Sequence, residues 1–346
     1  MLNHQVFMRR CFDLARLGAG SVSPNPMVGA VLVYENRIIG EGWHQKYGGA
    51  HAEVNAVNNV KEADRHLIKA STIYVSLEPC NIHGNTPPCT GLIIKEGIKK
   101  VVISCIDTTP EVKGLGIEML EQAGVEVEYG ILESVGRKIS AFRNTFTSKK
   151  RPFIQLKFAQ SLNGFIGIPG QQVWISNLFS KRATHKMRAE FDAILIGTQT
   201  ALTDNPQLSN RLYFGKSPLR VILDRNLTIP EDSEVFKGNN VTLIVTEQPT
   251  PVEVGLIHYR QINFDDNLLN NLLVVLADMK VTSLIVEGGA FTLGQFIKHN
   301  LWDKAWVFTG NKVVENGIPA PKVSGHIAGT YPLGGDNLSI FYNTTD

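Results

Sequence analysis

Apolar positions divide the first part of the chain into short helices and strands. They recur with a helical period over residues 5–17, and runs of branched apolar residues elsewhere are typical of buried strands. Helices are expected over residues 5–17, 53–60, 90–96, 117–123 and 133–145, and strands over 30–34, 37–41, 72–77, 101–106 and 125–129. The first two strands are close enough to form a hairpin. The alternation that follows predicts a sheet covered by helices, which is an α/β fold.

The charged segment Ser148-Lys149-Lys150-Arg151-Pro152 separates this part from a second one. A chain of 346 residues is too long for one typical core, so we predict two domains, over residues 1–147 and 148–346. In the second domain, strands are expected over 153–159, 193–197, 219–224, 241–245, 283–286, 305–308 and 338–342, and helices over 178–190 and from about 290 to 299.

Composition narrows the class of protein. A hydrophobic content of 43% and a charged content of 19% are those of a globular protein. The formal net charge of +2 gives no large basic field, so we expect no nucleic-acid partner. We expect no membrane partner, because no apolar run approaches the roughly 20 residues that cross a bilayer. The N-terminus lacks the apolar core of a signal peptide, and the cysteine usage suggests a reducing compartment, so we expect a cytoplasmic protein.

One histidine and two cysteines have the order expected of a catalytic zinc site. His51 stands in His-Ala-Glu, Cys80 follows a proline further along the chain, and Cys89 comes close behind. This is the signature of the zinc deaminases. Three protein ligands for one zinc ion leave the fourth tetrahedral position to water, as in catalytic sites. We also expect Cys80 to begin a helix, where the pKa of a thiol is lowered.

Glu53 is the candidate proton carrier of this site, because it lies two residues after the histidine. His51 and Glu53 would not share a face in the middle of a helix, but both can converge at a first turn. A bound zinc lowers the pKa of its water to about 7, and a neighbouring carboxylate can then move protons. Two other interpretations remain open: a structural zinc, and thiols that are simply buried.

Other polar residues have a functional and a structural interpretation each. Asn25, held between two prolines, is either a turn residue or an amide that binds a pyrimidine ring. Lys157 interrupts an apolar strand, so it either reaches the surface or faces a ligand. Arg188 and Arg211 could hold a phosphate between them, or could be surface arginines.

Polar residues of the second domain suggest a ligand-binding cleft. The amino-acid composition does not identify the ligand. Asp204 and Glu287 join the two arginines in this group. Gly288-Gly289 lies between a predicted strand and a predicted helix, where backbone amides can face an anion, although such a pair is often only a tight turn. The glycines match neither a Rossmann fingerprint nor a phosphate-binding P-loop.

These motifs together resemble the bifunctional deaminase/reductase family of riboflavin biosynthesis, over residues 4 to about 310. The first domain matches its Pro-Asn-Pro-x-Val-Gly loop at residues 24–29, its His-Ala-Glu, and its Glu-Pro-Cys-x-x-x-Gly-x-Thr-Pro-Pro-Cys. The gap of eight residues between Cys80 and Cys89 is specific to this family, because related deaminases usually have two. The second domain is similar to the family reductase in Lys157–Leu162, Trp174–Ser176, Thr200–Leu208 and Val286–Gly289.

The resemblance implies a fold, two reactions and a set of site residues. The fold would be a cytidine-deaminase-like three-layer α/β/α domain followed by a dihydrofolate-reductase-like α/β domain. One zinc ion, held by His51, Cys80 and Cys89 with Glu53 as proton carrier, would deaminate 2,5-diamino-6-(5-phosphoribosylamino)pyrimidin-4-one. NADPH would then reduce the ribosyl chain of the product. Residues implied to contact NADPH are Ala159, Trp174, Thr200, Asp204, Gly289, Ala290, Phe291, Thr292, Leu293, Gly294 and Gln295. Residues implied to contact substrate are Asn25, Lys157, Gln172, Arg188, Leu208, Arg211 and Glu287. The family also implies a homo-oligomer.

Departures from the family pattern keep one alternative open. Asn163 stands where the family often has aspartate, Gln172 replaces a common serine, and Thr309-Gly310 replaces a common Ala-Pro. The alternative is a deaminase whose second domain is a degenerate reductase.

Overall fold

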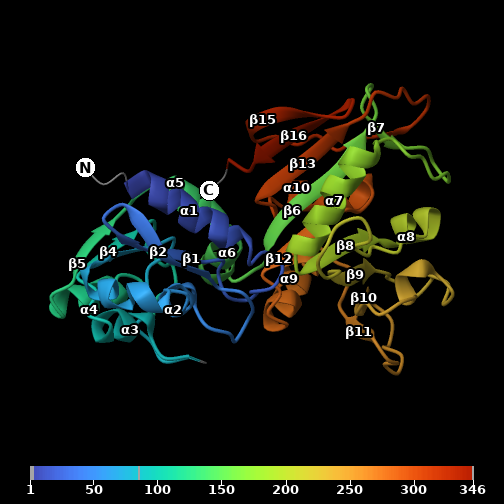
Figure 1. Ribbon diagram of the computed structural model, residues 1–346. Helices are drawn as coiled ribbons and strands as arrows, with labels where there is room; N and C mark the ends of the chain where they lie inside the picture. The colour runs from blue at the N-terminus through green and yellow to red at the C-terminus, as the bar shows by residue number, and fades with distance from the viewer. Residues whose placement is uncertain (1–3, 85, 345–346) are drawn as a thin grey trace. The chain divides into compact units, whose positions relative to one another are not determined.

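The computed structural model describes residues 4–84 and 86–344. The chain forms two compact units, Met1–Arg151 and Pro152–Asp346, so the division falls inside the charged segment singled out in the sequence. Each unit is a sheet with helices packed against it (Figure 1).

Unit 1 contains a five-stranded sheet in the order β2-β1-β3-β4-β5. Its strands are β1 (Gly29–Tyr34), β2 (Arg37–Trp43), β3 (Thr72–Val75), β4 (Lys100–Ile103) and β5 (Glu126–Tyr129). Its helices are α1 (His4–Arg16), α2 (Ala52–Asn58), α3 (Cys89–Lys95), α4 (Leu115–Gln122), α5 (Glu133–Ile139) and α6 (Ala141–Lys149), with a 3-10 helix at Glu62–Ala70. β1 and β2 form the predicted antiparallel hairpin, and β3, β4 and β5 run parallel.

The two faces of this sheet are covered by different helices, which makes three layers. Successive side chains of a strand point to opposite faces, and Val31 and Leu32 of β1 belong to separate apolar clusters. Val31 packs with Phe12 of α1 and with α5, whereas Leu32 packs with α2, α3 and α4 (Figure 1). Because β3 and β4 are parallel, the loops that follow them leave the same edge of the sheet. These loops carry Cys80 and Asp107.

Three sequence expectations for unit 1 were wrong or incomplete. The helix predicted over 133–145 is two helices that meet at Ser140, whose ψ of 10° departs from helical geometry. The 3-10 helix Glu62–Ala70 was not predicted, because only Ile68 in it is buried and the apolar period is weak. Cys80 does not begin a helix; it lies in the loop after β3, and Cys89 is the residue that begins one.

Unit 2 is built on a nine-stranded sheet in the order β11-β10-β9-β8-β12-β6-β13-β16-β15, with β7 and β14 paired separately. The strands are β6 (Phe153–Gln160), β7 (Phe165–Gly167), β8 (Ala193–Gly197), β9 (Leu219–Leu223), β10 (Thr242–Thr246), β11 (Ile257–Gln261), β12 (Ser283–Val286), β13 (Lys304–Thr309), β14 (Ile318–Pro319), β15 (His326–Leu333) and β16 (Asp336–Tyr342). The helices are α7 (Leu178–Glu190), α8 (Thr198–Asp204), α9 (Leu268–Asp278) and α10 (Ala290–Lys298), with a 3-10 helix at Glu234–Phe236. The sheet is parallel from β11 to β13 and antiparallel at β16 and β15.

All seven strands predicted for this unit are present, but β7, β11, β14, β15, α8, α9 and the 3-10 helix Glu234–Phe236 were not predicted. Helix α9 buries Leu272 and Leu276 against the sheet; its run of leucines and valines obscured the period. Strand β15 is mostly exposed, so it lacks the apolar pattern of a strand and is held by its pairing with β16. Strand β11 and helix α8 are short and carry similarly weak signals.

Candidate functional site

The three predicted metal ligands meet in unit 1. His51 immediately precedes α2, Cys80 lies in the loop after β3, and Cys89 begins α3. Their ligand atoms all lie within 4.8 Å of one another. The His51 Nδ1 atom is 3.3 Å from the Cys89 Sγ and 3.5 Å from the Cys80 Sγ. A tetrahedral zinc with bonds of about 2.0–2.3 Å separates nitrogen from sulfur by about 3.6 Å, so the three residues fit one zinc ion.

The chemistry of the two thiols also fits a metal. The hydrogen bond from the Cys89 thiol lowers the pKa of Cys80 to about 4. The pKa of Cys89 is raised, because it holds the shared proton and is buried. The two sulfurs therefore retain one proton between them, and a divalent cation at this position would displace it.

Removing one ligand should empty the metal site. We expect the wild type to bind one zinc ion per chain. Cys89→Ala should lower the affinity for zinc by at least about 100-fold, because even residues that only support a ligand change this affinity by 10- to 100-fold. Metal content of the purified protein measures this. The control is Cys105→Ala, which removes a buried thiol that is not a ligand. Equal zinc in the two variants would contradict the ligand assignment.

Glu53 reaches the same cavity as the ligands. It lies in the first turn of α2, two residues after His51, and lines a cavity of about 330 Å³ with His51 and Cys80. The first-turn geometry expected from the sequence therefore brings the two side chains together. Burial, together with the charge of Cys80, raises the pKa of Glu53 to about 7. A divalent cation nearby would oppose this shift.

A histidine not identified from the sequence orients the amide of Asn25. His44 Nδ1 lies 3.0 Å from the Ala50 carbonyl oxygen, so it carries the proton and donates it. Burial lowers the pKa of His44 and keeps the ring neutral. The neutral Nε2 accepts a hydrogen bond from Asn25 Nδ2 at 3.1 Å. This leaves the Asn25 Oδ1 as an acceptor at the same cavity, which Asn25 lines.

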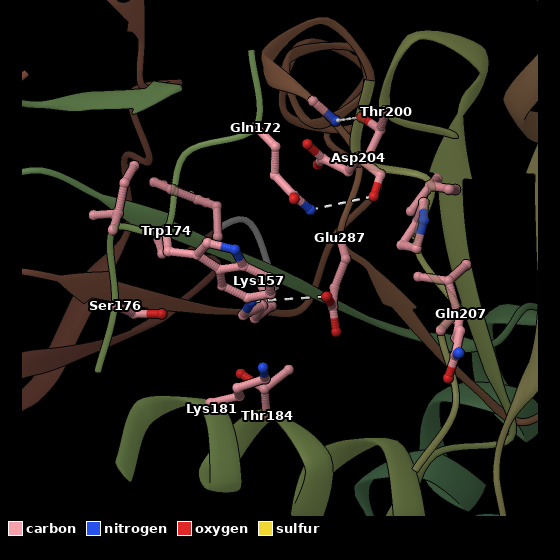
Figure 2. Close-up of a pocket in the computed structure, with 18 of the residues that line it drawn as sticks. Lys157, Gln172, Trp174, Ser176, Lys181, Thr184, Thr200, Asp204, Gln207 and Glu287 are labelled. Atoms are coloured by element: carbon pink, nitrogen blue, oxygen red, sulfur yellow. Dashed lines mark hydrogen bonds and ion pairs between the residues drawn. The ribbon is translucent and has the colours of Figure 1, made fainter. Parts of the chain in front are cut away.

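Unit 2 has a second cavity, of about 450 Å³. Figure 2 shows Lys157 and Glu287 inside it, with Lys181 and Thr184 projecting from α7. Lys157 Nζ lies 3.7 Å from Glu287 Oε2, and Arg188 binds the same carboxylate through two nitrogens at 3.1 and 2.9 Å. Burial would raise the pKa of Glu287, but Arg188 and Lys157 outweigh it and lower this pKa to about 2. Burial also lowers the pKa of Lys157, which makes it a better proton donor.

Most residues predicted for the reductase site line this cavity. They are Lys157, Ala159, Gln172, Trp174, Arg188, Thr200, Asp204, Leu208, Arg211, Glu287 and Gly289. The following six, Ala290, Phe291, Thr292, Leu293, Gly294 and Gln295, do not. Leu293 packs in the core, whereas Phe291 is 79% exposed. A continuous stretch was predicted, but a helix turns successive side chains away from one another, so α10 presents only its N-terminal end.

Two groups that were predicted to bind an anion of the ligand, the Gly289 N–H and the Arg188 guanidinium, are hydrogen-bonded to other residues of the protein. The Gly289 N–H donates to Thr200 Oγ1 at 2.9 Å, so this amide does not face an anion. The guanidinium of Arg188 is held by Glu287, whereas Arg211 bonds to Ser209 Oγ and Gln207 and stays exposed. The two arginines therefore differ, and only Arg211 is without a carboxylate partner among the described residues.

The departure at Asn163 has a structural explanation. Its Nδ2 donates to the Val314 carbonyl at 2.9 Å, and its Oδ1 accepts from the Val314 N–H at 3.1 Å. An amide can make both bonds, whereas an ionised carboxylate can only accept. Asn163 therefore ties a turn to a neighbouring loop.

The loop that carries Arg211 is held by hydrogen bonds to a buried histidine, and these bonds require one ring nitrogen of that histidine to be unprotonated. His185 Nδ1 accepts from the backbone N–H groups of Arg211 and Leu212 at 2.9 and 3.4 Å. Burial lowers the pKa of His185 to about 4; the charges of Arg188 and Arg211 add to this shift and that of Glu287 opposes it.

Stability is expected to fall as this histidine is protonated. Between pH 6.5 and about 4 the unfolded chain binds a proton that folded His185 does not, so the free energy of unfolding decreases as pH falls through that window. Urea unfolding at pH 7 and pH 4.5 measures the loss. His185→Asn, which keeps an acceptor but does not titrate, should lose less, whereas the exposed control His326→Asn should behave as wild type. Equal losses in all three would contradict the assignment.

Several residues of the two cavities were missed in the sequence. In unit 1 they include His44, Glu78, Asp107, Thr109 and Arg143; in unit 2 they include Lys181, Thr184, His185 and Gln207. A weak signal existed in unit 2, because Lys181, Thr184 and Arg188 are spaced to share one face of a helix. No local pattern marks Asp107 or Arg143, which lie in separate elements.

Comparison with known proteins identifies the family of each domain. Residues 1–105 match the family model of the cytidine and deoxycytidylate deaminase zinc-binding region, and residues 152–317 match that of the RibD C-terminal domain. The riboflavin biosynthesis protein RibD of Aquifex aeolicus is 36% identical over 90% of this chain and 88% of its own length. RibD of Escherichia coli is 32% identical over 90% of this chain and 89% of its own.

Solved structures show the same arrangement of elements. The deaminase/reductase of Thermotoga maritima, described as acting on diaminohydroxyphosphoribosylaminopyrimidine and 5-amino-6-(5-phosphoribosylamino)uracil, superimposes with a TM-score of 0.90 and 35% identity over 98% of both chains. RibD of Acinetobacter baumannii gives a TM-score of 0.89 and 28% identity over 99% of both. These matches confirm the predicted fold class. The chain belongs to the RibD family and is a bifunctional enzyme of riboflavin biosynthesis, with a zinc-binding deaminase domain and an NADPH-dependent reductase domain.

Proposed function

We propose that unit 1 deaminates 2,5-diamino-6-(5-phosphoribosylamino)pyrimidin-4-one and that unit 2 reduces the ribosyl chain of the resulting uracil to ribityl. The observation that carries the first reaction is the meeting of His51, Cys80 and Cys89, together with Glu53, which lines one cavity with His51 and Cys80. The relative from Thermotoga maritima, whose description names both activities, supports the pairing of the two reactions.

In the deaminase site, His51, Cys80 and Cys89 would hold zinc, which would lower the pKa of a water molecule and make it a nucleophile at neutral pH. Glu53 takes one proton from the attacking water and gives it to the ring nitrogen. It then takes the remaining hydroxyl proton and gives it to the departing amine, so a C–O bond replaces the C–N bond and ammonia leaves. The Asn25 amide, oriented by His44, accepts a hydrogen bond from an N–H group of the pyrimidine.

In the reductase site, NADPH supplies a hydride to C1 of the sugar. As the C1–H bond forms, the bond between C1 and the ring oxygen breaks, and that oxygen needs a proton to become a hydroxyl group. Lys157 is placed to give this proton, because it is buried beside Glu287 and its pKa is lowered. Ala159, Trp174, Thr200, Asp204 and Gly289 contact NADPH, whereas Gln172, Arg188, Leu208, Arg211 and Glu287 contact the substrate.

The setting of the two reactions is part of the proposal. Each reaction belongs to its own domain, with the boundary in residues 148–152, and the protein works as a homo-oligomer in the cytoplasm. No helix among residues 4–84 and 86–344 is both long and apolar enough to cross a bilayer. Both substrates are small phosphorylated pyrimidines, which agrees with the absence of a strong basic charge.

Two half-reactions assayed separately test the proposal. We expect ammonia release from the diaminopyrimidine, and NADPH oxidation with the deaminated product as substrate. Ammonia release without NADPH oxidation would instead support a degenerate reductase domain. The ordered Lys157–Glu287–Arg188 group argues against that alternative. RNA binding in place of either reaction would support an editing module, which the net charge of +2 disfavours.

A further inference from the structure

One arginine in the deaminase cavity has no role in the proposed chemistry. Arg143, on α6, is the only lysine or arginine that lines this cavity among the described residues. Its one hydrogen bond is from Nη2 to Thr109 Oγ1, at 3.3 Å, and no described carboxylate lies within 4.0 Å. Arg137 on the preceding helix, by contrast, pairs with Glu133 at 2.6 Å. Arg143 is therefore not ion-paired with any described carboxylate, although Glu53, Glu78 and Asp107 also line the cavity.

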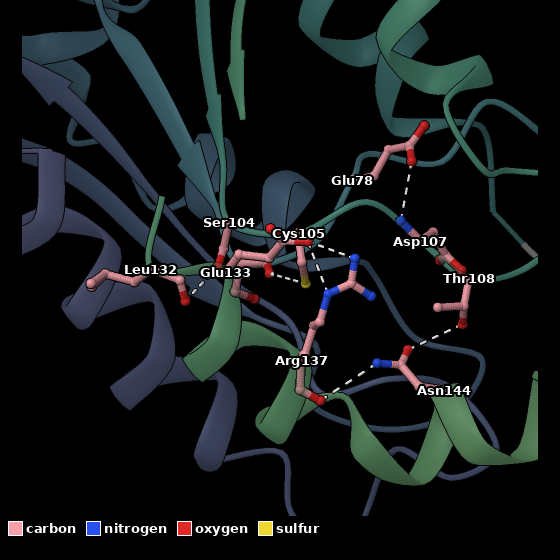
Figure 3. A network of polar contacts seen from close by, with 10 residues as sticks. Glu78, Ser104, Cys105, Asp107, Thr108, Leu132, Glu133, Arg137 and Asn144 are labelled. Carbon is pink, nitrogen blue, oxygen red and sulfur yellow. Dashed lines mark hydrogen bonds and ion pairs between the residues drawn. The ribbon is translucent and has the colours of Figure 1, made fainter. Parts of the chain in front are cut away.

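A series of polar contacts connects the loop before Cys80 with helix α6, which carries Arg143; Figure 3 shows the contacts of Glu78 with Asp107 and of Thr108 with Asn144. Glu78, two residues before Cys80, accepts the Asp107 N–H at 3.1 Å and the N–H groups of Gly114 and Gly116 at 3.0 Å.

The next residue in the same loop, Thr108, continues the series. It donates to Asn144 Oδ1 at 3.2 Å and lies 2.9 Å from Thr147 Oγ1, and both partners are on α6. These contacts link the metal-binding loop, the loop after β4 and helix α6. They hold the helix that carries Arg143 against the metal-binding loop, and the bond to Thr109 directs the guanidinium toward the cavity.

A phosphate is the group that this arrangement suits. The guanidinium presents planar donors that match phosphate oxygens, and Thr109, which accepts from Arg143, keeps its own hydroxyl proton to donate. Two of the acidic side chains that line the cavity are engaged by backbone N–H groups: Glu78 accepts three of them, and Asp107 accepts that of Thr109 at 2.7 Å. Arg143 is the arginine of this lining that remains to bind an anion, and the Thr109 hydroxyl lies beside it. We propose that Arg143 and Thr109 form the phosphate subsite of the deaminase, which anchors the phosphoribosyl end of the substrate while the ring lies at the metal. This inference rests on the proposed deaminase function.

The test compares a phosphorylated and a dephosphorylated substrate. With the phosphoribosyl compound, Arg143→Gln should raise KM by about 10- to 150-fold, the loss expected for a hydrogen bond between charged groups. The change in kcat should be small, because the arginine does not touch the reacting atoms. With the corresponding nucleoside, which lacks the phosphate, Arg143→Gln should behave as wild type. Arg143→Lys, which keeps the charge but not the planar donors, should fall between the two.

Controls separate this inference from a structural role and from the proposed function. Arg137→Gln should leave both KM values unchanged, and zinc content should be equal in every variant. Equal losses on both substrates, or no loss on either, would overturn the phosphate assignment while the deaminase function stands. If wild type deaminates neither compound, the proposed function itself is wrong.

A wild-type measurement makes the test independent of how Arg143→Gln folds. Ribose 5-phosphate should compete with the phosphorylated substrate in the wild-type deaminase assay, whereas ribose should not. The absence of such competition would overturn the subsite.

Discussion

Replacing Glu53 with glutamine should abolish ammonia release while zinc stays bound and NADPH oxidation continues. Glu53 lines the cavity with His51 and Cys80, whereas the Glu78 carboxylate is engaged by three backbone N–H groups, and the proposed reaction sends every proton transfer through Glu53. General acid–base catalysis contributes about 10²–10⁴-fold, so we expect kcat of the deaminase to fall by at least about 100-fold. Glutamine keeps the shape of a side chain that is 3% exposed, and therefore the packing of α2.

The measurement is ammonia release under saturating substrate, with metal content determined on the same sample. Glu62→Gln is the matched control, because Glu62 has the same chemistry but its side chain is 93% exposed and away from the cavity. Activity near that of wild type in Glu53→Gln would show that another group carries the protons. Loss of zinc along with activity would instead point to a structural effect at the neighbouring His51.

Replacing Lys157 with methionine should remove reduction and leave deamination intact. The variant loses the group placed to protonate the sugar oxygen, so we expect kcat for NADPH oxidation to fall by about 10²–10⁴-fold. The fold should persist, because Glu287 keeps its two bonds to Arg188 and methionine fits where a lysine stem packs. Breaking the group from the other side, by replacing Glu287, would strand two buried cations and destabilise the domain.

The measurement is NADPH oxidation with the deaminated substrate, together with ammonia release as the internal reference. Lys186→Met on α7 is the matched control, since Lys186 forms a surface ion pair with Glu190 outside the cavity. A rise in KM for the substrate with unchanged kcat would mean that Lys157 only binds the substrate. Unchanged values of both would remove it from the site.

Local patterns in the sequence predicted most of the elements, because backbone structure follows from the period of apolar residues. Helix 5–17 and the hairpin of β1 and β2 are examples in which one face of each element is buried. The prediction failed where burial is weak or uniform. Strand β15 is mostly exposed, and α9 is apolar around much of its surface, so neither carries the expected period.

Residue types with a rare chemistry made the metal site predictable without a structure. A histidine and two cysteines in family spacing have few other reasons to occur together, and the structure brings their ligand atoms within 4.8 Å. The reductase site was less well determined. Lys157 and Glu287 lie in the cavity as predicted, but residues 290–295 do not, since a segment that passes a site presents only some of its atoms.

By itself the sequence determined the α/β class and predicted two domains and the candidate zinc ligands, because these follow from residue type and from spacing along the chain. Only the tertiary structure decided how distant residues meet. It placed His44 on the amide of Asn25, paired Arg188 with Glu287, and brought Arg143 into the deaminase cavity. The physical reason is that such contacts depend on the pairing of strands and the packing of helices, which hold side chains to within a few tenths of an ångström, and no local period records those distances.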